Sequence, residues 1–306
     1  MIPQKAPKRV NQEMIESASI TAMMRAIMAS SELNKVNPDY LAENFIAGDW
    51  KNFLQSPLES FKVLEKRIPG AINYIQIRTK YFDRSLERWL KKYNNSQVVI
   101  IGAGFDSRAI RFRDLSGNGT VFYELDLEAM LEYKDDILTQ IKHPRNSKTN
   151  IYVPINLHTD DISRSLIDNG FDKDKNTIFL LEGISFFIEP RQIKKLLFSL
   201  KTLVNRNISI TLDYAFQDYI EGNIKYLGAK ETKDELKKLG EPHLFGLNFE
   251  DVYGFADDFN FVPVDNFTSK MLETKFPSDK YGTNLLGYAS GFFGLVEFQY
   301  IIKSNI

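Results

Sequence analysis

The stretch QVVIIGAGFDSRAIRF, residues 97–112, decides the fold. Its apolar run ends at a turn made by Gly102, Ala103 and Gly104, and an acid and two arginines follow. A short apolar run that ends at glycine predicts a buried strand, and glycine lets the backbone turn sharply and come close to a ligand. The stretch therefore predicts a strand followed by a ligand-binding turn. A tight turn without a ligand is the alternative.

Apolar runs and helical segments alternate after this stretch. Such alternation predicts an α/β fold with a doubly wound, mostly parallel sheet. Two β-rich runs close the chain, joined by a loop that contains residues 281–291, and we expect the last strand to be antiparallel to its neighbours. The seven predicted strands are 98–102, 120–126, 150–157, 176–183, 207–216, 260–269 and 292–303.

Two segments lie outside this alternation. Residues 13–95 have helical periodicity, with an apolar stripe along 71–93, and predict a helical N-terminal cap over residues 1–95. The core then covers residues 96–306. Within the core, the polar and helical segment 217–246 interrupts the alternation, which predicts a lid insertion over one edge of the sheet.

The composition excludes several classes of function. The formal net charge of -1 gives no strong attraction to nucleic acid or to an anionic membrane. The chain has no cysteine, and its three histidines have no ligand-like spacing, so we expect no metal site. The N-terminus lacks the apolar core of a signal peptide, and no apolar stretch is long enough to cross a bilayer. We therefore expect a cytoplasmic protein.

The residues after the glycines distinguish between nucleotide-like ligands. A dinucleotide-binding turn has Gly or Ala three residues after its second glycine, but Ser107 stands there and Asp106 precedes it. A carboxylate beside a pyrophosphate is unfavourable because like charges repel. S-adenosyl-L-methionine carries a sulfonium, an ammonium and a carboxylate but no phosphate, so it suits this turn better.

An acid ends the second predicted strand. Asp126 lies about 20 residues past the glycines, where a carboxylate can accept hydrogen bonds from both hydroxyls of a ribose. Glu124 is on the same side of the strand but deeper. Both NAD and S-adenosyl-L-methionine contain a ribose, so this acid does not discriminate between them. The alternative role for Asp126 is the N-cap of the following helix.

Blocks along the chain resemble, in order, those of the leucine carboxyl methyltransferase family. This family includes protein-phosphatase carboxyl methyltransferases and bacterial O-methyltransferases of polyketide and other small-molecule pathways. The resemblance spans about residues 19–300 and implies a Rossmann-like class I methyltransferase fold, with a seven-stranded sheet, an antiparallel last strand, a helical cap and a lid. The blocks are ITAMMRAI, PDYLAENF, RTKYFDRSLERWL, VVIIGAGFDSRAIRF, YELDLEAMLEYKDDIL, VPINL, NGFDKDKNTIFLLEGISFFI and GEPHLFGL.

The resemblance implies a set of residues that bind S-adenosyl-L-methionine. Arg78 matches the arginine that pairs with its carboxylate, and a guanidinium can make two parallel hydrogen bonds there. Glu182 matches a glutamate beside the amino group and the methyl donor. The alternatives are a solvated helix arginine and a helix-capping glutamate. The other implied positions are Gly102, Ala103 and Gly104 under the methionine portion, Asp126 and Leu127 at the ribose, and Asn156 and Leu157 at adenine.

Position 156 departs from the family pattern. The family usually has Asp where Asn156 stands. An Asn carbonyl can still accept a hydrogen bond from the adenine amino group, and Asp160 or Asp161 could take part instead. The family often has a tyrosine near Phe187. This chain has no tyrosine there, so any role of that hydroxyl is lost.

Candidates for the acceptor side are less defined. Arg108 is expected to pair with Asp106 and stiffen the turn, with a contact from Arg108 or Arg111 to an acidic substrate as the alternative. Arg25 either meets an acceptor carboxylate or lies on the surface. An ionised carboxylate needs no general base, and the absence of a His–Asp pair favours such an acceptor. The other possible acceptor contacts are Asp213, Tyr214 and His243.

The sequence thus favours an O-methyltransferase that uses S-adenosyl-L-methionine and a small-molecule acceptor bearing a carboxylate or a hydroxyl, of the kind found in secondary metabolism. One alternative is methylation of the C-terminal carboxylate of a protein. An NAD-dependent oxidoreductase and a non-catalytic sensor of S-adenosyl-L-methionine are further alternatives. Neither the acceptor nor the oligomeric state follows from the sequence.

Overall fold

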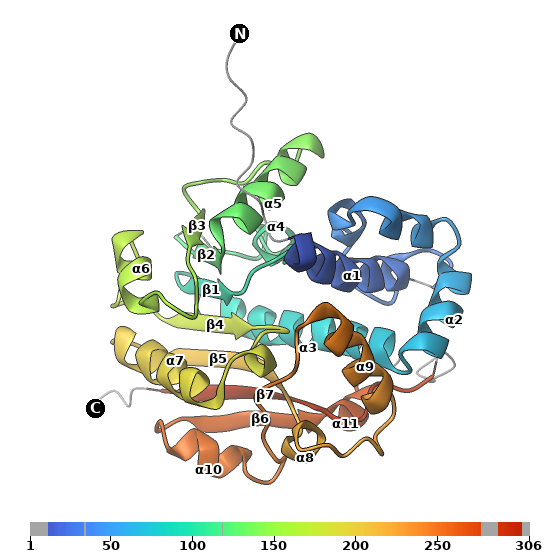
Figure 1. Cartoon of the computed structure of the whole chain (residues 1–306). Coiled ribbons are helices and arrows are strands. Elements are labelled where there is room, and N and C mark those ends of the chain that lie inside the picture. Colours follow the sequence, from blue (N-terminus) through green and yellow to red (C-terminus); the bar gives the residue numbers. More distant parts are fainter. Residues whose placement is uncertain (1–11, 34, 118, 277–286, 302–306) are drawn as a thin grey trace.

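A seven-stranded sheet runs through the middle of the molecule in the order β3-β2-β1-β4-β5-β7-β6 (Figure 1). The computed structural model describes residues 12–33, 35–117, 119–276 and 287–301. Strand β7 pairs antiparallel with both of its neighbours, and the other paired strands are parallel. This topology confirms the predicted fold class. The strands are β1 (Gln97–Ile101), β2 (Val121–Asp126), β3 (Asn150–Pro154), β4 (Thr177–Leu181), β5 (Ile208–Ala215), β6 (Val262–Thr268) and β7 (Phe293–Tyr300).

Helices cover both faces of the sheet because its central strands are apolar on both sides. Along β1, Val98 and Ile100 belong to the core on one face, and Val99 and Ile101 to the core on the other. The first core includes residues of α1 (Gln12–Ala29), α2 (Pro57–Arg67), α3 (Ala71–Lys92) and α5 (Glu128–Gln140). The second includes residues of α6 (Ile162–Asp168), α7 (Pro190–Leu203) and α10 (Val252–Asp257).

The N-terminal cap is helical as expected, with one local difference. The segment 38–50 lies within the predicted helical range but forms no α-helix, and it contains the 3-10 turn η1 (Ala42–Phe45) and the start of η2 (Gly48–Leu54). The Asp39 carboxylate accepts a hydrogen bond from the backbone N–H of Leu41, and Gly48 has a φ of 56°. Local side-chain bonds and a left-handed glycine both compete with a regular helix.

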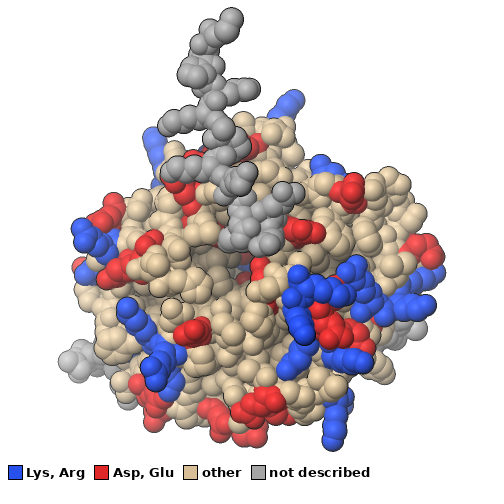
Figure 2. All heavy atoms as spheres, viewed as in Figure 1, with Lys and Arg blue, Asp and Glu red and all other residues tan. Residues whose placement is uncertain are grey.

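The predicted insertion forms a small helical unit after β5. It contains α8 (Gln217–Ile220) and α9 (Ala229–Leu239), and α9 lies on the same side of the molecule as α1 (Figure 1). An ion pair of 2.6 Å between Arg67 and Glu235 joins α9 to α2. Basic and acidic side chains are intermixed on the face in Figure 2, including the region over α9.

Short elements complete the chain. These are α4 (Arg108–Arg111), η3 (Ser185–Phe187) and α11 (Ser269–Glu273). The loop expected at 281–291 lies largely outside the described residues. Over the described ranges, no helix combines the length and apolar character that a membrane crossing requires, and no cluster of His, Asp or Glu is suited to hold a metal ion.

Candidate functional site

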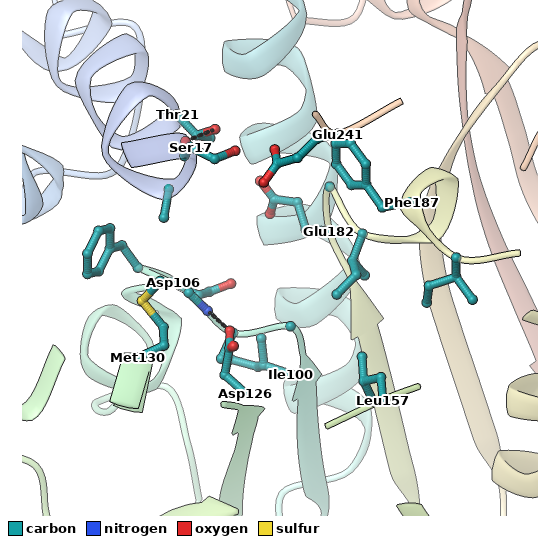
Figure 3. Close-up of a pocket in the computed structure, with 18 of the residues that line it drawn as sticks. Ser17, Thr21, Ile100, Asp106, Asp126, Met130, Leu157, Glu182, Phe187 and Glu241 are labelled. Carbon is teal, nitrogen blue, oxygen red and sulfur yellow. Dashed lines mark hydrogen bonds between the residues drawn. The ribbon is translucent and has the colours of Figure 1, made fainter. Parts of the chain in front are cut away.

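A cavity of about 490 Å³ lies at the carboxyl ends of β1, β2 and β4, where α1 and the segment after α9 close over them (Figure 3). Ligands bind at this edge in doubly wound sheets, and the volume suits a cofactor-sized molecule. The lining includes eight of the predicted site residues, namely Arg25, Arg78, Gly102, Ala103, Gly104, Asp126, Leu157 and Glu182.

The glycine turn after β1 forms the floor of the cavity. Gly102 has a φ of 66°, and a Cβ there would lie 2.2 Å from Cδ1 of Ile184. Gly104 has a φ of 42°, and a Cβ there would meet only the carbonyl oxygen of Gly102, at 4.0 Å. Both values of φ disfavour other residues. At Gly104 the unoccupied space belongs to the cavity, so a ligand can approach the backbone there.

Asp126 connects β2 to the glycine turn. Its Oδ2 accepts the backbone N–H of Gly104 at 2.7 Å (Figure 3), and its Oδ1 accepts that of Leu127 at 2.7 Å. The alternative role as helix N-cap is wrong, because α5 begins at Glu128 and has Leu127 at its N-cap position. Burial raises the pKa of the Asp126 carboxyl, while the two backbone donors oppose that rise. Leu127 contributes its backbone N–H and does not line the cavity.

Asp106 occupies the start of the short helix α4. Its Oδ1 accepts the backbone N–H of Arg108 at 2.7 Å, and its Oδ2 pairs with Nη1 of the same arginine at 2.5 Å. The prediction that Arg108 stiffens the turn is therefore confirmed. Burial alone would raise the pKa of Asp106, but the charges of Arg108, Lys134 and Arg111 and the backbone N–H of Arg108 together hold that pKa below its ordinary value. The protein's own carboxylate thus takes a backbone N–H at the start of α4, where a negative group is favoured.

Arg78 and Glu182 form a buried ion pair at the end of β4. Nε of Arg78 lies 3.1 Å from Oε1 of Glu182, and its Nη1 lies 3.2 Å from Oδ2 of Asp213. Burial alone would lower the pKa of Arg78, but Asp213 and Glu182 hold it above the ordinary value. Arg78 is thus not a solvated helix arginine. Glu182 is not a helix cap, because Ile184 holds the N-cap position of η3.

A chain of ion pairs extends from this site to the N-terminal cap. Arg108 Nη1 lies 2.6 Å from Oε2 of Glu182, and Nε of Arg108 lies 2.8 Å from Asp83. Arg111 also pairs with Asp83, at 2.6 Å. The alternative in which Arg108 or Arg111 faces a substrate is therefore not supported, because both guanidiniums are committed to carboxylates of the protein.

Arg25 on α1 ends this chain, because Asp39, which lies 3.7 Å from Nε of Arg111, also pairs with Arg25. Its Nε lies 3.0 Å from Asp39, and its Nη2 donates to the carbonyl of Phe105 at 2.9 Å. The expectation of a surface role is wrong, because Arg25 is buried and lines the cavity. A contact between Arg25 and an acceptor carboxylate stays a prediction.

The segment after β3 contributes Leu157 and His158 to the lining but not Asn156. The side-chain oxygen of Asn156 accepts the backbone N–H of His158 at 3.0 Å, and Asp160 accepts the backbone N–H of Asn156 at 2.8 Å. Asp161 caps α6. These polar groups stabilise the loop, which accounts for the position of Asn156 outside the lining.

Three expected acceptor contacts lie outside the cavity lining. Asp213 is fully buried and accepts hydrogen bonds from Arg78, Tyr74 and the backbone of Gly183. The hydroxyl of Tyr214 donates to Asn266 on β6 at 2.8 Å. The expectation that Asp213 and Tyr214 contact the acceptor is therefore corrected, because both side chains are bonded to partners within the fold.

His243 is the third of these residues, and it is enclosed by aromatic rings. Those of Phe186 and Phe187 lie 4.4 and 5.1 Å from its ring, centroid to centroid. Burial, assisted by the charges of Lys233 and Arg78, lowers the pKa of His243 to about 3. The imidazole is thus a neutral packing group beside the cavity rather than part of its wall.

The structure adds residues that the sequence did not single out. Ser17 and Thr21 line the cavity one helical turn apart on α1, and Glu241 approaches it from the lid side (Figure 3). Gly183, at a φ of 70°, packs against Arg78, and a Cβ there would lie 2.9 Å from Nη1 of that arginine. The spacing of Ser17, Thr21 and Arg25 by four residues was the available signal, since such residues share a helix face.

Comparisons with known proteins agree with this fold. A Mycolicibacterium smegmatis protein, provisionally named as an S-adenosyl-L-methionine-dependent methyltransferase, is 31% identical over 189 residues, which are 60% of this chain and 62% of that protein. A Mycobacterium bovis protein with the same provisional name is 29% identical over 205 residues, which are 64% and 66% of the two chains. The chain thus spans less than two thirds of the length of either relative.

A solved structure shares the fold at low sequence identity. The crystal structure of a Thermobifida fusca protein, provisionally described as a methyltransferase, has a TM-score of 0.58 at 10% identity and covers 92% of this chain and 94% of that one. The family model described as leucine carboxyl methyltransferase matches residues 18–201, which is more than half of the chain. The protein therefore belongs to the leucine carboxyl methyltransferase family.

Proposed function

We propose that the protein is a methyltransferase that uses S-adenosyl-L-methionine. The observation that carries this proposal is the position of Asp106 at the start of α4. Its carboxylate takes the backbone N–H of Arg108, a donor that a pyrophosphate would otherwise use. A second negative group at that point would be repelled. This argues against the NAD-dependent alternative and favours a nucleoside ligand without phosphate.

The charges of the cavity wall support the same ligand. Among the described residues, the lining carries four carboxylates and two guanidiniums, an acidic excess. S-adenosyl-L-methionine has one net positive charge from its sulfonium, ammonium and carboxylate, so it complements this wall electrostatically. NADH would add the negative charges of its phosphates to an acidic cavity. The charged lining residues are Asp106, Asp126, Glu182, Glu241, Arg25 and Arg78.

The residues present fit each part of this cofactor. Asp126 keeps lone pairs for the ribose hydroxyls, since each of its oxygens accepts one backbone N–H. Nη2 of Arg78 donates no hydrogen bond to the described residues and is suited to a carboxylate. Glu182 supplies a carboxylate for the ammonium. Ile100, Met130 and Leu157 provide apolar contacts for the adenine side (Figure 3).

When bound, the cofactor supplies a methyl group that its sulfonium has already activated. The protein's contribution is then to align the acceptor and to exclude water. Ser17 and Thr21 on α1, together with Phe187 and Leu244, form the part of the wall where an acceptor can be aligned. His243 cannot act as a base from its aromatic enclosure. We infer that the acceptor is a small molecule with a carboxylate, which needs no base, or an acidic hydroxyl.

A radiolabelled methyl-transfer assay tests this function. The chain is incubated with methyl-labelled S-adenosyl-L-methionine and with separate panels of aromatic acids, aliphatic acids, phenols and a peptide ending in leucine. Label that transfers to a small acid and is released by mild base identifies a methyl ester. Transfer to the peptide would favour the protein-directed alternative. The absence of transfer from a protein that binds the cofactor would favour the sensor alternative.

A further inference from the structure

Glu182 has one carboxylate oxygen held by each of two guanidiniums. Oε1 lies 3.1 Å from Nε of Arg78, and Oε2 lies 2.6 Å from Nη1 of Arg108. The two arginines come from α3 and α4, so they fix the carboxylate from separate elements. Glu182 lines the cavity, and in Figure 3 its carboxylate points into the same space as Glu241. The orientation of this carboxylate therefore depends on both arginines.

Arg108 is itself anchored on all sides. Its Nε donates to Asp83 at 2.8 Å, its Nη1 to Asp106 at 2.5 Å, and its Nη2 to the carbonyl of Thr79 at 3.3 Å. Its guanidinium also lies 5.5 Å from the ring centre of Phe82. Only 3% of Arg108 is exposed, and it does not line the cavity. A guanidinium whose planar set of donors is held by acceptors on several sides has little freedom to rotate.

We infer that Arg108 is a positioning residue that fixes the carboxylate of Glu182 for the ammonium of the cofactor. The inference rests on the proposed function, since it assumes that Glu182 meets that ammonium. The contacts of Arg108 to Asp83 and Thr79 anchor it behind the wall, and its contacts to Asp106 and Glu182 reach residues that line the cavity. Of these two carboxylates, Glu182 is the one that the proposed function places at the ammonium. Because Arg108 does not touch the cavity, it acts on the ligand through Glu182.

Loss of Arg108 would also change the contacts of Arg78. Without Arg108, Oε2 of Glu182 loses its partner and the carboxylate can rotate toward the remaining guanidinium. Nη2 of Arg78, which donates to no described residue, would then be drawn to Glu182. Both the ammonium and the carboxylate of the ligand would lose their partners. The effect is therefore confined to the amino-acid portion of the ligand and spares its nucleoside.

A double-mutant cycle tests this inference by calorimetry. The full chain and the variants Arg108→Gln, Glu182→Gln and the double variant are titrated with S-adenosylhomocysteine, which carries the amino-acid portion, and with 5′-methylthioadenosine, which lacks it. We expect Arg108→Gln to weaken S-adenosylhomocysteine about tenfold, within the range of direct couplings. The same change should have little further effect in the Glu182→Gln background. Binding of 5′-methylthioadenosine should change by less than about twofold in every variant.

Two further variants keep the test decisive. Arg111→Gln is the matched control, because Arg111 shares Asp83 with Arg108 but has no contact with Glu182. It should leave both ligands unaffected. If Arg108→Gln does not fold, Arg108→Lys retains the cation beside Asp106 but cannot hold all the acceptors at once. It should weaken the binding of S-adenosylhomocysteine selectively, by less than Arg108→Gln does.

The outcomes separate the inference from the proposed function. Equal losses for the two ligands, or a loss that persists undiminished in the Glu182→Gln background, would mean that Arg108 is only structural and would overturn the inference. A natural chain that binds neither ligand would overturn the cofactor proposal itself. A selective loss that disappears with Glu182 supports both.

Discussion

The two walls of the cavity are built in different ways. The wall at the strand ends consists of the glycine turn, Asp126 and the buried ion pairs around Glu182, where every charged group has several partners. The opposite wall consists of α1 and the segment after α9, where Ser17, Thr21 and Leu244 face the space with short or apolar side chains. The first wall suits one fixed ligand. Ser17, Thr21 and Leu244 carry no charge, so replacing them leaves no buried charge without its partner.

The largest expected effect lies in the first wall. Arg78→Ala should lower the free energy of unfolding by about 3–5 kcal/mol, because it leaves Glu182 and Asp213 buried without their shared cation. Urea denaturation followed by circular dichroism measures this. Arg84→Ala, an exposed position on the same helix, is the control and should change stability by no more than about 0.5 kcal/mol. Similar stability for both variants would mean that the ion pairs do not support this wall.

A smaller effect is expected on ligand affinity in the same wall. Asp126→Ala should weaken S-adenosylhomocysteine by about 1.5–3 kcal/mol, the range for hydrogen bonds to a charged acceptor. Calorimetric titration gives the value. Asp161→Ala removes an acid that caps α6 and does not line the cavity, and its affinity should be unchanged. Unchanged affinity in a folded Asp126→Ala protein would remove Asp126 from the ligand site.

The residues beside the second wall predict a pH dependence of stability. His243 has a pKa lowered to about 3 by burial, against about 6.5 in the unfolded chain. Below pH 6.5 the unfolded state therefore binds a proton that the folded state does not, and stability falls as the pH falls from 6.5 toward 3. Between pH 6 and 5 the natural chain should lose about 1 kcal/mol more than His243→Phe. Urea denaturation at the two pH values measures these losses. An equal loss of stability in the natural chain and in His243→Phe would contradict this enclosure of His243.

The smallest effect is expected from the second wall itself. Thr21→Val removes a hydroxyl at nearly constant volume. Affinity for S-adenosylhomocysteine should change by less than about twofold, as for a surface substitution away from the ion pairs, while the KM for the acceptor changes. A combined titration and steady-state assay measures both. A loss of affinity comparable to that of Asp126→Ala would show that α1 also holds the cofactor, and the contrast between the walls would fail.

The first wall was largely predictable from the sequence because local features define it. Gly102 and Gly104 are required by the turn, and Asp126 and Glu182 lie at the ends of β2 and β4, the two strands that flank β1. All four line the cavity. Parallel strands bring their carboxyl ends to one edge of the sheet, so the alternation of strands and helices predicts that the ends of these strands share an edge. The family resemblance singled out Glu182.

The positions of the other predicted side chains depend on contacts between segments that are distant in the sequence. The partner of Arg25 at Phe105 is 80 residues away, and no local pattern indicates it. Tyr214 is adjacent to the end of β5, yet its hydroxyl meets Asn266 of β6, because the direction of a side chain at a strand end depends on the neighbouring strand. His243 lies in a block next to the cavity, but the aromatic rings that enclose it come from separate segments.

The central claim is that the glycine turn binds a sulfur nucleoside without phosphate and that Asp106 excludes a pyrophosphate. Calorimetric titration of the full chain with S-adenosylhomocysteine, S-adenosyl-L-methionine and NADH, side by side, tests it most directly. The account predicts micromolar binding of the first two and no heat of binding for NADH. Binding of NADH, with no binding of the two sulfur nucleosides, would contradict it.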